Sequence, residues 1–481
     1  MPDRLSEFGE IGHVRRLPVC AQQRGAAHRS LRGSMGLSRQ HAIVIGASIA
    51  GLCAARALSE FFERVTVIDR DELPAEPVAR RGVPQSRQLH FLLARGREAF
   101  DELFPGMSDE LIGAGAVAAD MQAAVNWNFA GHRLRKAESG LIGIGLSRSL
   151  LEFTVRSRVT QLPPVTLVER CDVMDLLVDP DLRRVTGVRA RRHADGSVGS
   201  ALDADLVVDA SGRGTRGATW LEALGYQRAP EERLRIQLAY QTRSYSREPE
   251  DLAADFGSVY APYPEQTRSA AINAVAVDRF MVVLSTCGGE DLPAREEAMV
   301  EFAESVGGHD IAEVIRTAPP LTEPVLMRFP ESIRRRYEQL DRFPEGYLVV
   351  GDALCSFNPL YGQGMTVAAL EALLLMSLLR EQADDLAHRF FSAASGLLDT
   401  PWNLTTSGDM QFAHVEGEPS AEMLEMEEYF QRYREAAAND AVLTGALLRV
   451  FNLLDEPSRL SEPDLRARVL QATGRATAPS S

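Results

Sequence analysis

A short glycine-containing loop near the start of the chain has the residue types and spacing to bind the phosphates of a dinucleotide. The loop reads GASIAG and runs from Gly46 to Gly51. Gly46 allows a tight turn, the small Ser48 lets a pyrophosphate approach the backbone, and Gly51 lets the following helix pack closely. Asp69 follows about 20 residues later, where an acid can accept hydrogen bonds from a ribose. Together these residues predict a dinucleotide-binding site.

Two apolar segments flank this loop and have the pattern of buried parallel strands. Residues 42–45 precede the loop, and residues 64–68 form the second segment. A helix-length segment with Leu52, Ala55 and Leu58 on one face separates them. The pattern predicts a β-α-β unit with phosphates at the helix N-terminus, and it does not distinguish FAD from NAD.

Three later stretches favour a flavin. Ser147 is the expected N-cap of a helix that begins with Arg148, and the segment DASG, which contains Asp209, ends an apolar strand. Asp352 follows a glycine at the end of another strand, and residues 359–365 then run into a helix N-terminus. An acid in that place can bind a ribityl hydroxyl, and the helix start offers backbone N–H groups to the flavin ring at C2 and N1.

The order of the predicted elements indicates an α/β chain in which a parallel-sheet domain is interrupted by a second domain. Short alternating apolar segments in 116–146 and strand-like runs at 235–243, 270–277 and 279–286 predict an antiparallel sheet. Two further apolar strands return to the first sheet. The predicted division is a disordered extension at 1–40, FAD-binding segments at 41–115, 146–215 and 331–383, substrate-domain segments at 116–145 and 216–330, and a helical C-terminal region at 384–481. The fold class is therefore a Rossmann-like FAD-binding domain interleaved with an antiparallel-sheet substrate domain.

Taken together, these motifs resemble those of the FAD-dependent monooxygenases of the para-hydroxybenzoate hydroxylase type. The resemblance covers about residues 42–379, and GDALCSFNPLYGQGM is its most specific part. Within this family, that motif, RRGVPQSRQLH and TPWNLTTSGDMQF are most similar to bacterial polyketide-pathway enzymes. These are the flavin epoxidases of polyether pathways and the flavin-dependent cyclases that form decalin rings.

The resemblance implies FAD as the cofactor and a set of residues that bind it. In such enzymes an arginine in the place of the pair Arg80-Arg81 contacts FAD, and a residue in the place of Val173 contacts the adenine through its backbone. The full implied set is Gly46, Ala47, Ser48, Ala50, Gly51, Asp69, Arg70, Arg80, Arg81, Arg148, Val173, Asp352, Pro359, Gly362, Gly364 and Met365.

The implied reaction is oxygen transfer to a polyketide-like natural-product intermediate. A flavin C4a-hydroperoxide delivers one oxygen atom to an alkene or aromatic ring, as an epoxidation or a hydroxylation. This chemistry needs no strong base, so we expect an apolar cavity and assign no catalytic residue. His90 is a weak acid/base candidate, with a local hydrogen bond at the start of a helix at 91–104 as the alternative.

Two pairs of residues are candidates for the substrate cavity. Trp127 and Phe129 could line it, although aromatic residues at a period of two are also typical of a plain core. Asp409 and Gln411 could approach a substrate, with a polar loop as the alternative.

Other reactions remain as alternatives. An FAD-bound, non-redox cyclase that catalyses [4+2] decalin-type ring formation in polyketide antibiotic biosynthesis would need the same binding motifs, and an alkene reductase or a non-enzymatic FAD-binding protein is less well supported. A halogenase is disfavoured because Lys136 is the only lysine and NWNF, at 126–129, does not match the WxWxIP stretch of that class. The electron source is NAD(P)H or a partner flavin reductase, because the chain has no second dinucleotide motif.

Composition and charge exclude several other functions. The 481 residues carry a formal net charge of −15, which argues against nucleic-acid binding. Because the chain has no apolar run of about 18 residues, we expect no membrane-spanning helix. Five scattered cysteines without a CxxC pair indicate free thiols, a cytoplasmic location and no metal site. The expected partner is a small hydrophobic substrate.

Overall fold

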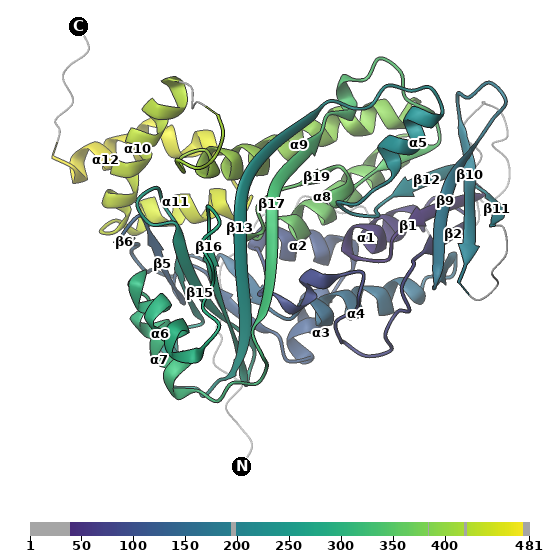
Figure 1. Ribbon diagram of the computed structural model, residues 1–481. Helices are drawn as coiled ribbons and strands as arrows, with labels where there is room; N and C mark the ends of the chain where they lie inside the picture. The colour runs from purple at the N-terminus through teal and green to yellow at the C-terminus, as the bar shows by residue number, and fades with distance from the viewer. Residues whose placement is uncertain (1–38, 194–198, 383, 418–420, 475–481) are drawn as a thin grey trace, which may run out of the picture. The chain divides into compact units, whose positions relative to one another are not determined.

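The computed structural model of the chain describes residues 39–193, 199–382, 384–417 and 421–474 (Figure 1). The predicted disordered extension lies, except for its last two residues, outside the described residues. Within the described part of the chain, the strands form four sheets. None of the helices there is both long enough and apolar enough to cross a membrane.

The first sheet is parallel and has five strands in the order β18-β12-β1-β2-β8. Its strands are β1 (His41–Ile45), β2 (Arg64–Ile68), β8 (Val165–Val168), β12 (Leu206–Asp209) and β18 (Tyr347–Val349). β1 pairs with β2 on one side and with β12 on the other, and every residue of β1 is buried. Helix α1 (Ile49–Leu58) connects β1 to β2, so the predicted β-α-β unit is confirmed.

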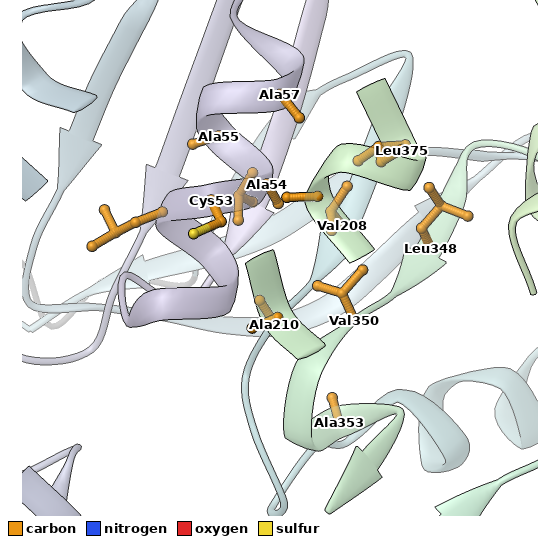
Figure 2. Close-up of a cluster of buried hydrophobic side chains, with 14 of the residues drawn as sticks. Cys53, Ala54, Ala55, Ala57, Val208, Ala210, Leu348, Val350, Ala353 and Leu375 are labelled. Carbon is orange, nitrogen blue, oxygen red and sulfur yellow. The ribbon is translucent and has the colours of Figure 1, made fainter. Parts of the chain in front are cut away.

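Helix α1 packs closely against helix α8 (Gly364–Arg380), as Figure 2 shows. The small side chain of Ala54 lies towards Leu375 of α8, and Val208 and Leu348 of the sheet lie beside this contact. Alanine buries little apolar surface, but its small side chain lets two helices approach closely and pack densely. This packing places the start of α8 beside the start of α1.

The second sheet has eight strands in the order β19-β17-β13-β16-β15-β14-β5-β6. Its strands are β5 (Val125–Phe129), β6 (His132–Arg133), β13 (Glu231–Ser246), β14 (Gly257–Tyr260), β15 (Arg268–Ala276), β16 (Arg279–Thr286), β17 (Val325–Arg335) and β19 (Cys355–Ser356). All neighbours are antiparallel except β14 and β5, which are parallel. Figure 1 shows β13 and β17 as two long neighbouring strands. The predicted antiparallel sheet is confirmed.

Two three-stranded sheets complete the strand structure of the described residues. One contains β3 (Phe91–Leu92), β4 (Val117–Asp120) and β7 (Ile142–Gly145), and the other contains β9 (Cys171–Val178), β10 (Val185–Arg192) and β11 (Ser200–Asp203). The strands of the parallel sheet all come from the three predicted FAD-binding segments. The exact boundaries of those segments stay a prediction.

The remaining helices connect the sheets and form the C-terminal region. They are α2 (Ala94–Leu103), α3 (Met107–Gly113), α4 (Arg148–Thr160), α5 (Gly217–Ala223), α6 (Glu296–Ser305), α7 (His309–Thr317), α9 (Leu386–Asp409), α10 (Ala421–Ala437), α11 (Ala441–Phe451) and α12 (Pro463–Ala472). Short 3-10 turns are η1 (Pro84–Arg87), η2 (Asp251–Ala254), η3 (Tyr337–Gln339), η4 (Gly351–Ala353), η5 (Pro359–Tyr361) and η6 (Pro457–Ser461). Ser147 caps α4 as expected, since its hydroxyl accepts a hydrogen bond from Leu150 N at 3.1 Å.

Two expectations about local structure are wrong. The polar-loop alternative for the segment around Asp409 fails because helix α9 continues through Pro401 to Asp409. Leu398, Trp402 and Thr405 are buried along one face of α9, and this burial stabilises the helix against the proline. The helix expected at 91–104 begins only at Ala94, because the two residues of β3 pair with β7 first.

Candidate functional site

A single cavity of about 1700 Å³ connects the edge of the parallel sheet to the eight-stranded sheet and the C-terminal helices. Sites for one small ligand usually measure about 300–1,000 Å³. The cavity therefore has room for a dinucleotide and for a second ligand. We call its two parts the dinucleotide end, which contains Gly46, Asp69 and Asp352, and the apolar compartment, which contains Trp127 and Phe451.

Most of the residues predicted from the sequence line this cavity. The lining includes Gly46, Ser48, Ala50, Asp69, Arg70, Arg80, His90, Arg148, Val173, Asp352, Pro359, Gly362, Gly364 and Met365. Ala47, Gly51 and Arg81 are not among the lining residues. Gly51 and Ala47 lie behind the loop surface, and the Arg81 side chain is exposed.

Close packing explains both glycines of the phosphate loop. Gly46 has a φ of +102°, and a Cβ there would lie 2.6 Å from the carbonyl oxygen of Ala210. A Cβ on Gly51 would lie 1.8 Å from the carbonyl oxygen of Gly46. Ser48 is the N-cap residue of α1, but its side chain makes no capping hydrogen bond. The N-cap side chain therefore does not occupy the first N–H groups of α1, and these groups can bind an anion.

Asp69 ties the end of β2 to the phosphate loop. Its Oδ2 accepts a hydrogen bond from Ala47 N at 2.7 Å, and its Oδ1 accepts one from Asp71 N at 2.8 Å. Ala47 therefore uses its N–H within the protein. Asp69 Oδ1 also accepts a hydrogen bond from Arg80 Nη1 at 3.2 Å, whereas Oδ2 can accept a second bond, so Asp69 has capacity for a ribose hydroxyl through Oδ2.

Arg80 is the centre of a buried ionic network next to Asp69. Its side chain is 6 % exposed, and its Nε contacts Glu152 Oε1 at 2.7 Å. Its Nη1 contacts Asp71 Oδ2 at 2.8 Å and Asp69 Oδ1 at 3.2 Å. Burial lowers the pKa of Arg80, but Glu152 and Asp69 outweigh it, and the net direction is upward. The structure thus separates Arg80 from its exposed neighbour Arg81, a distinction that the sequence does not make.

Glu152, which does not line the cavity but holds lining residues in place, is a contact that the sequence reasoning missed. Besides Arg80, it accepts a hydrogen bond from the hydroxyl of Ser48 at 2.8 Å, while Arg148 Nη2 donates to the same hydroxyl at 2.8 Å. Arg148, Glu152 and Arg156 follow each other at intervals of four on α4, which places them on one helix face. This spacing of charged residues is the sequence signal that could have identified Glu152.

Arg148 and Asp352 face each other across the dinucleotide end. Arg148 is buried, and its Nε has no hydrogen-bond partner. Asp352 projects into the cavity, and its side chain is exposed there although it lies deep in the protein. Burial raises the pKa of Asp352, and Arg148 and Arg213 oppose that rise. The pair offers a guanidinium and a carboxyl group to the hydroxyls and phosphates of a ligand.

The loop at 351–364 brings backbone donors to the same part of the cavity. Gly351 has a φ of +63°, and its N–H donates to Glu371 Oε2 at 2.6 Å. Gly362 and Gly364 have open space where a Cβ would be, with no atom within 4 Å. At the N-terminus of α8 the backbone therefore borders the cavity without side chains in front of it. Its N–H groups can reach a ring that has hydrogen-bond acceptors along one edge.

Asp209 has a structural role in the neighbouring loop. It is fully buried and accepts hydrogen bonds from Ser211 N, from the hydroxyls of Ser211 and Thr215, and from Tyr347 Oη. These bonds fix the turn after β12. Arg213, further along the turn, lines the cavity and lies 4.4 Å from the ring centroid of Phe329.

His90 lies in the cavity wall and is held by a local hydrogen bond. Its Nδ1 lies 2.9 Å from the carbonyl oxygen of Gln88, which fixes Nδ1 as the donor. Burial and the nearby Arg148 lower its pKa to about 4. The imidazole is neutral near pH 7, and its remaining nitrogen can accept a hydrogen bond.

An aromatic wall, made of Trp127, Phe129, Tyr361 and Phe451, lines the apolar compartment. The ring centroids of Trp127 and Phe451 are 5.9 Å apart, and those of Tyr361 and Phe451 are 6.1 Å apart. Trp127 and Phe129 thus line the cavity, as the sequence suggested. Phe451 ends α11, more than 300 residues away in sequence from Trp127, and no sequence signal placed it there.

Three polar residues of the cavity wall, Gln411, Glu427 and Arg434, form a connected group near the C-terminal helices. Gln411 donates to Glu427 Oε2 at 2.7 Å, and Arg434 pairs with the other oxygen of Glu427 at 2.5 Å. Lys136 pairs with Asp255 at 2.6 Å and is not among the lining residues. Within the described residues, no three His, Cys, Asp or Glu side chains are grouped to hold a metal ion.

The residues present fit a flavin dinucleotide. The open start of α1 suits a pyrophosphate. Arg148 Nε, which makes no hydrogen bond, and the carboxyl of Asp352 suit polar hydroxyls, and the glycines at the start of α8 suit a ring edge. These groups all border one continuous cavity.

Comparisons with known proteins agree with this geometry. No family model matches the chain. Protein Rv3254 of Mycobacterium tuberculosis is 36% identical over 446 residues, which cover 88% of this chain and 92% of that protein.

Among solved structures, the flavin-dependent brominase Bmp2 has a TM-score of 0.61 at 14% identity and covers 90% of this chain and 98% of its own. PqsL, a probable FAD-dependent monooxygenase from Pseudomonas aeruginosa, has a TM-score of 0.56 at 18% identity, with 78% of this chain and 99% of that chain covered. The Diels-Alderase PyrE3 of the pyrroindomycin pathway has a TM-score of 0.58 at 15% identity, with 86% and 81% covered. These likenesses show that the chain shares their fold.

Proposed function

The chain belongs to the same protein family as Rv3254, and from its fold and its cavity we propose that it is an FAD-dependent monooxygenase. It transfers one oxygen atom to an alkene or aromatic ring of a polyketide-like natural-product intermediate. The observation that carries the proposal is the continuity of the cavity, which joins a flavin-compatible dinucleotide end to an apolar compartment.

Each part of the dinucleotide end has a role in holding FAD. The N-terminus of α1 binds the pyrophosphate, Asp69 binds the ribose, and Asp352 binds the ribityl chain. The start of α8, with Gly362 and Gly364, borders the ring. When bound, FAD supplies the activation of O₂ and the delivery of one oxygen atom.

In this proposal the protein orients the substrate and excludes water from the cavity. The aromatic wall orients a planar, apolar substrate, and the buried side chains around it keep water away from the reacting atoms. His90 is a weak base in the cavity wall, because it is held by Gln88 and its pKa is lowered to about 4. Electrons come from NAD(P)H, either directly or through a partner flavin reductase.

A second candidate is an FAD-bound cyclase without a redox step. The aromatic wall favours it because a shaped apolar surface can fold a polyene for a [4+2] ring closure. The likeness to the Diels-Alderase PyrE3 is compatible with this candidate and does not favour it over oxygen transfer.

Product mass separates the two candidates. The full chain, loaded with FAD, is incubated with a conjugated polyene polyketide and with an aryl polyketide, with and without NADPH and O₂. Oxygen transfer predicts a product heavier by one oxygen atom, formed only when NADPH and O₂ are both present. A product of unchanged mass, formed anaerobically without reductant, would refute oxygen transfer and support the cyclase.

Asp352 tests the assignment of FAD. Changing Asp352→Asn removes the negative charge between Arg148 and Arg213, and we expect the dissociation constant of FAD to rise about tenfold, which equals about 1.4 kcal/mol. The measurement is the recovery of FAD fluorescence as the cofactor leaves the protein. Asp278→Asn, at an exposed turn outside the cavity, is the matched control and should bind FAD as the wild type does. Equal retention by both variants would contradict the assigned position of the ribityl chain.

A further inference from the structure

A buried side-chain pair joins the end of α9 to the loop at 351–364. Asp409 and Asn358 are each 1 % exposed, and Asn358 Nδ2 donates to Asp409 Oδ1 at 2.9 Å. Asn358 is also the N-cap residue of η5, because its Oδ1 accepts a hydrogen bond from Leu360 N at 3.0 Å. Asp409 therefore holds the residue that sets the conformation of η5, immediately before α8.

The second oxygen of Asp409 has no hydrogen-bond partner. The titratable groups that face it are Tyr361 of η5 and Cys287, which follows β16, and burial raises the pKa of both thiol and phenol. Glu427 of α10 acts on Tyr361 and is itself paired with Arg434. Asp409 thus has a hydrogen bond from a neutral amide and no cation as a partner, so its burial favours the protonated acid.

The other end of the same loop is held in a similar way. Glu371 of α8 is 1 % exposed, accepts a hydrogen bond from Gly351 N, and has one oxygen without a partner. The loop is thereby fixed between two buried carboxyl groups. Of the two, Asp409 borders the cavity and Glu371 does not, so Asp409 is the one at the junction with the apolar compartment.

We propose that Asp409 is a positioning residue for the bound flavin, which acts as a neutral acid through Asn358 to fix Pro359–Gly364 against the ring. The inference rests on the proposed function insofar as FAD is the group that this loop meets. Ionisation of Asp409 would place an unpaired charge in the protein interior, so the loop should loosen as the acid loses its proton.

Burial raises the pKa of Asp409 to about 7, while the hydrogen bond from Asn358 lowers it. The folded protein therefore holds its proton to a higher pH than the unfolded chain does. Stability contributed by the protonated form is present at low pH and is lost as the pH rises from about 4 to about 7. Above that range the loss should stay constant.

Three variants test the inference in the full chain. Asp409→Asn keeps an uncharged side chain with an acceptor for Asn358, Asp409→Ala removes the acceptor, and Asp385→Asn makes the same chemical change at the exposed start of α9. The first readout is the visible spectrum of bound FAD from about pH 5 to about pH 9. The second is the melting temperature of the FAD-free chain from about pH 4 to about pH 9.

We expect Asp409→Ala to shift the flavin spectrum and to weaken FAD retention several-fold, while Asp409→Asn restores both. We also expect the spectrum of Asp409→Asn to lose the pH dependence that the wild type has near pH 7. In the FAD-free chain, the melting temperature of Asp409→Asn should rise above that of the wild type by a few °C, on the order of 3 °C, as the pH increases from about 4 to about 7. Asp385→Asn should follow the wild type in every measurement.

If the spectra and pH profiles of Asp409→Ala and Asp409→Asn both equal those of the wild type, the inference is overturned. If Asp409→Ala does not fold, Asp409→Asn decides alone, and a pH profile identical to the wild type overturns it. A wild-type chain that retains FAD and shows these effects but transfers no oxygen would refute the proposed function and leave the inference standing. A wild-type chain that binds no FAD would refute both.

Discussion

Gly51→Ala is expected to reduce the affinity for FAD by about 100-fold or more, equal to about 2.8 kcal/mol. The added Cβ would lie 1.8 Å from the carbonyl oxygen of Gly46, and the backbone fixes the positions of both atoms. Because neither can rotate away, α1 must move from β1, and the N–H groups at its start lose their alignment. Equilibrium dialysis of FAD against the purified variant measures the change.

Gly396→Ala is the matched control for this substitution. Gly396 also lies inside a helix, α9, but a Cβ there would meet no atom within 4 Å. The exchange should leave FAD binding unchanged and stabilise the fold by about 0.5–1 kcal/mol, because alanine restricts the unfolded chain. FAD affinity of Gly51→Ala equal to that of Gly396→Ala would show that the phosphate loop does not bind the cofactor.

Arg80→Ala is expected to cost about 3–5 kcal/mol of the free energy of unfolding, the usual penalty for removing one partner of a buried ionic network. Asp69, Asp71 and Glu152 would be left together without their shared cation. Urea denaturation of the full chain measures the loss.

The neighbouring residue gives an internal reference. Arg81 is exposed, so Arg81→Ala should change the free energy of unfolding by about 0.5 kcal/mol or less. Equal effects of the two variants would mean that the buried network contributes nothing to stability. If Arg81→Ala weakened FAD binding strongly without changing stability, Arg81 would have to be assigned to the cofactor site.

The elements around the phosphate loop could be predicted because their signals are local. A glycine in a tight turn, an apolar run and a helix face all depend on residues within about 30 positions. The strands of the antiparallel sheet at 270–277 and 279–286 carried the same kind of signal, and both are present, the first as β15 within two residues and the second, β16, with the same bounds. Ser147 was recognised for the same reason, since an N-cap interaction spans three residues.

The contacts that fix the site could not be predicted from these patterns. Glu152 meets Arg80 across 72 positions, and Phe451 meets Trp127 across a longer separation, so both contacts depend on tertiary packing. The segment ending at Asp409 has the composition of a loop, but burial of Leu398 and Trp402 overrides that preference and extends the helix. Local sequence therefore indicated the cofactor class and left the substrate compartment undefined.

The bond between Asp69 and Ala47 has a consequence for the energetics of binding. Asp69 Oδ2 holds the N–H of Ala47 at 2.7 Å, and Arg80 Nη2 donates to the carbonyl oxygen of the same residue at 3.1 Å. Both polar groups of this peptide position are anchored by side chains of the protein itself. Little conformational entropy is then left for the loop to lose on association, so more of the contact energy is retained as affinity. Such preorganisation is expected to appear as slow dissociation of the dinucleotide.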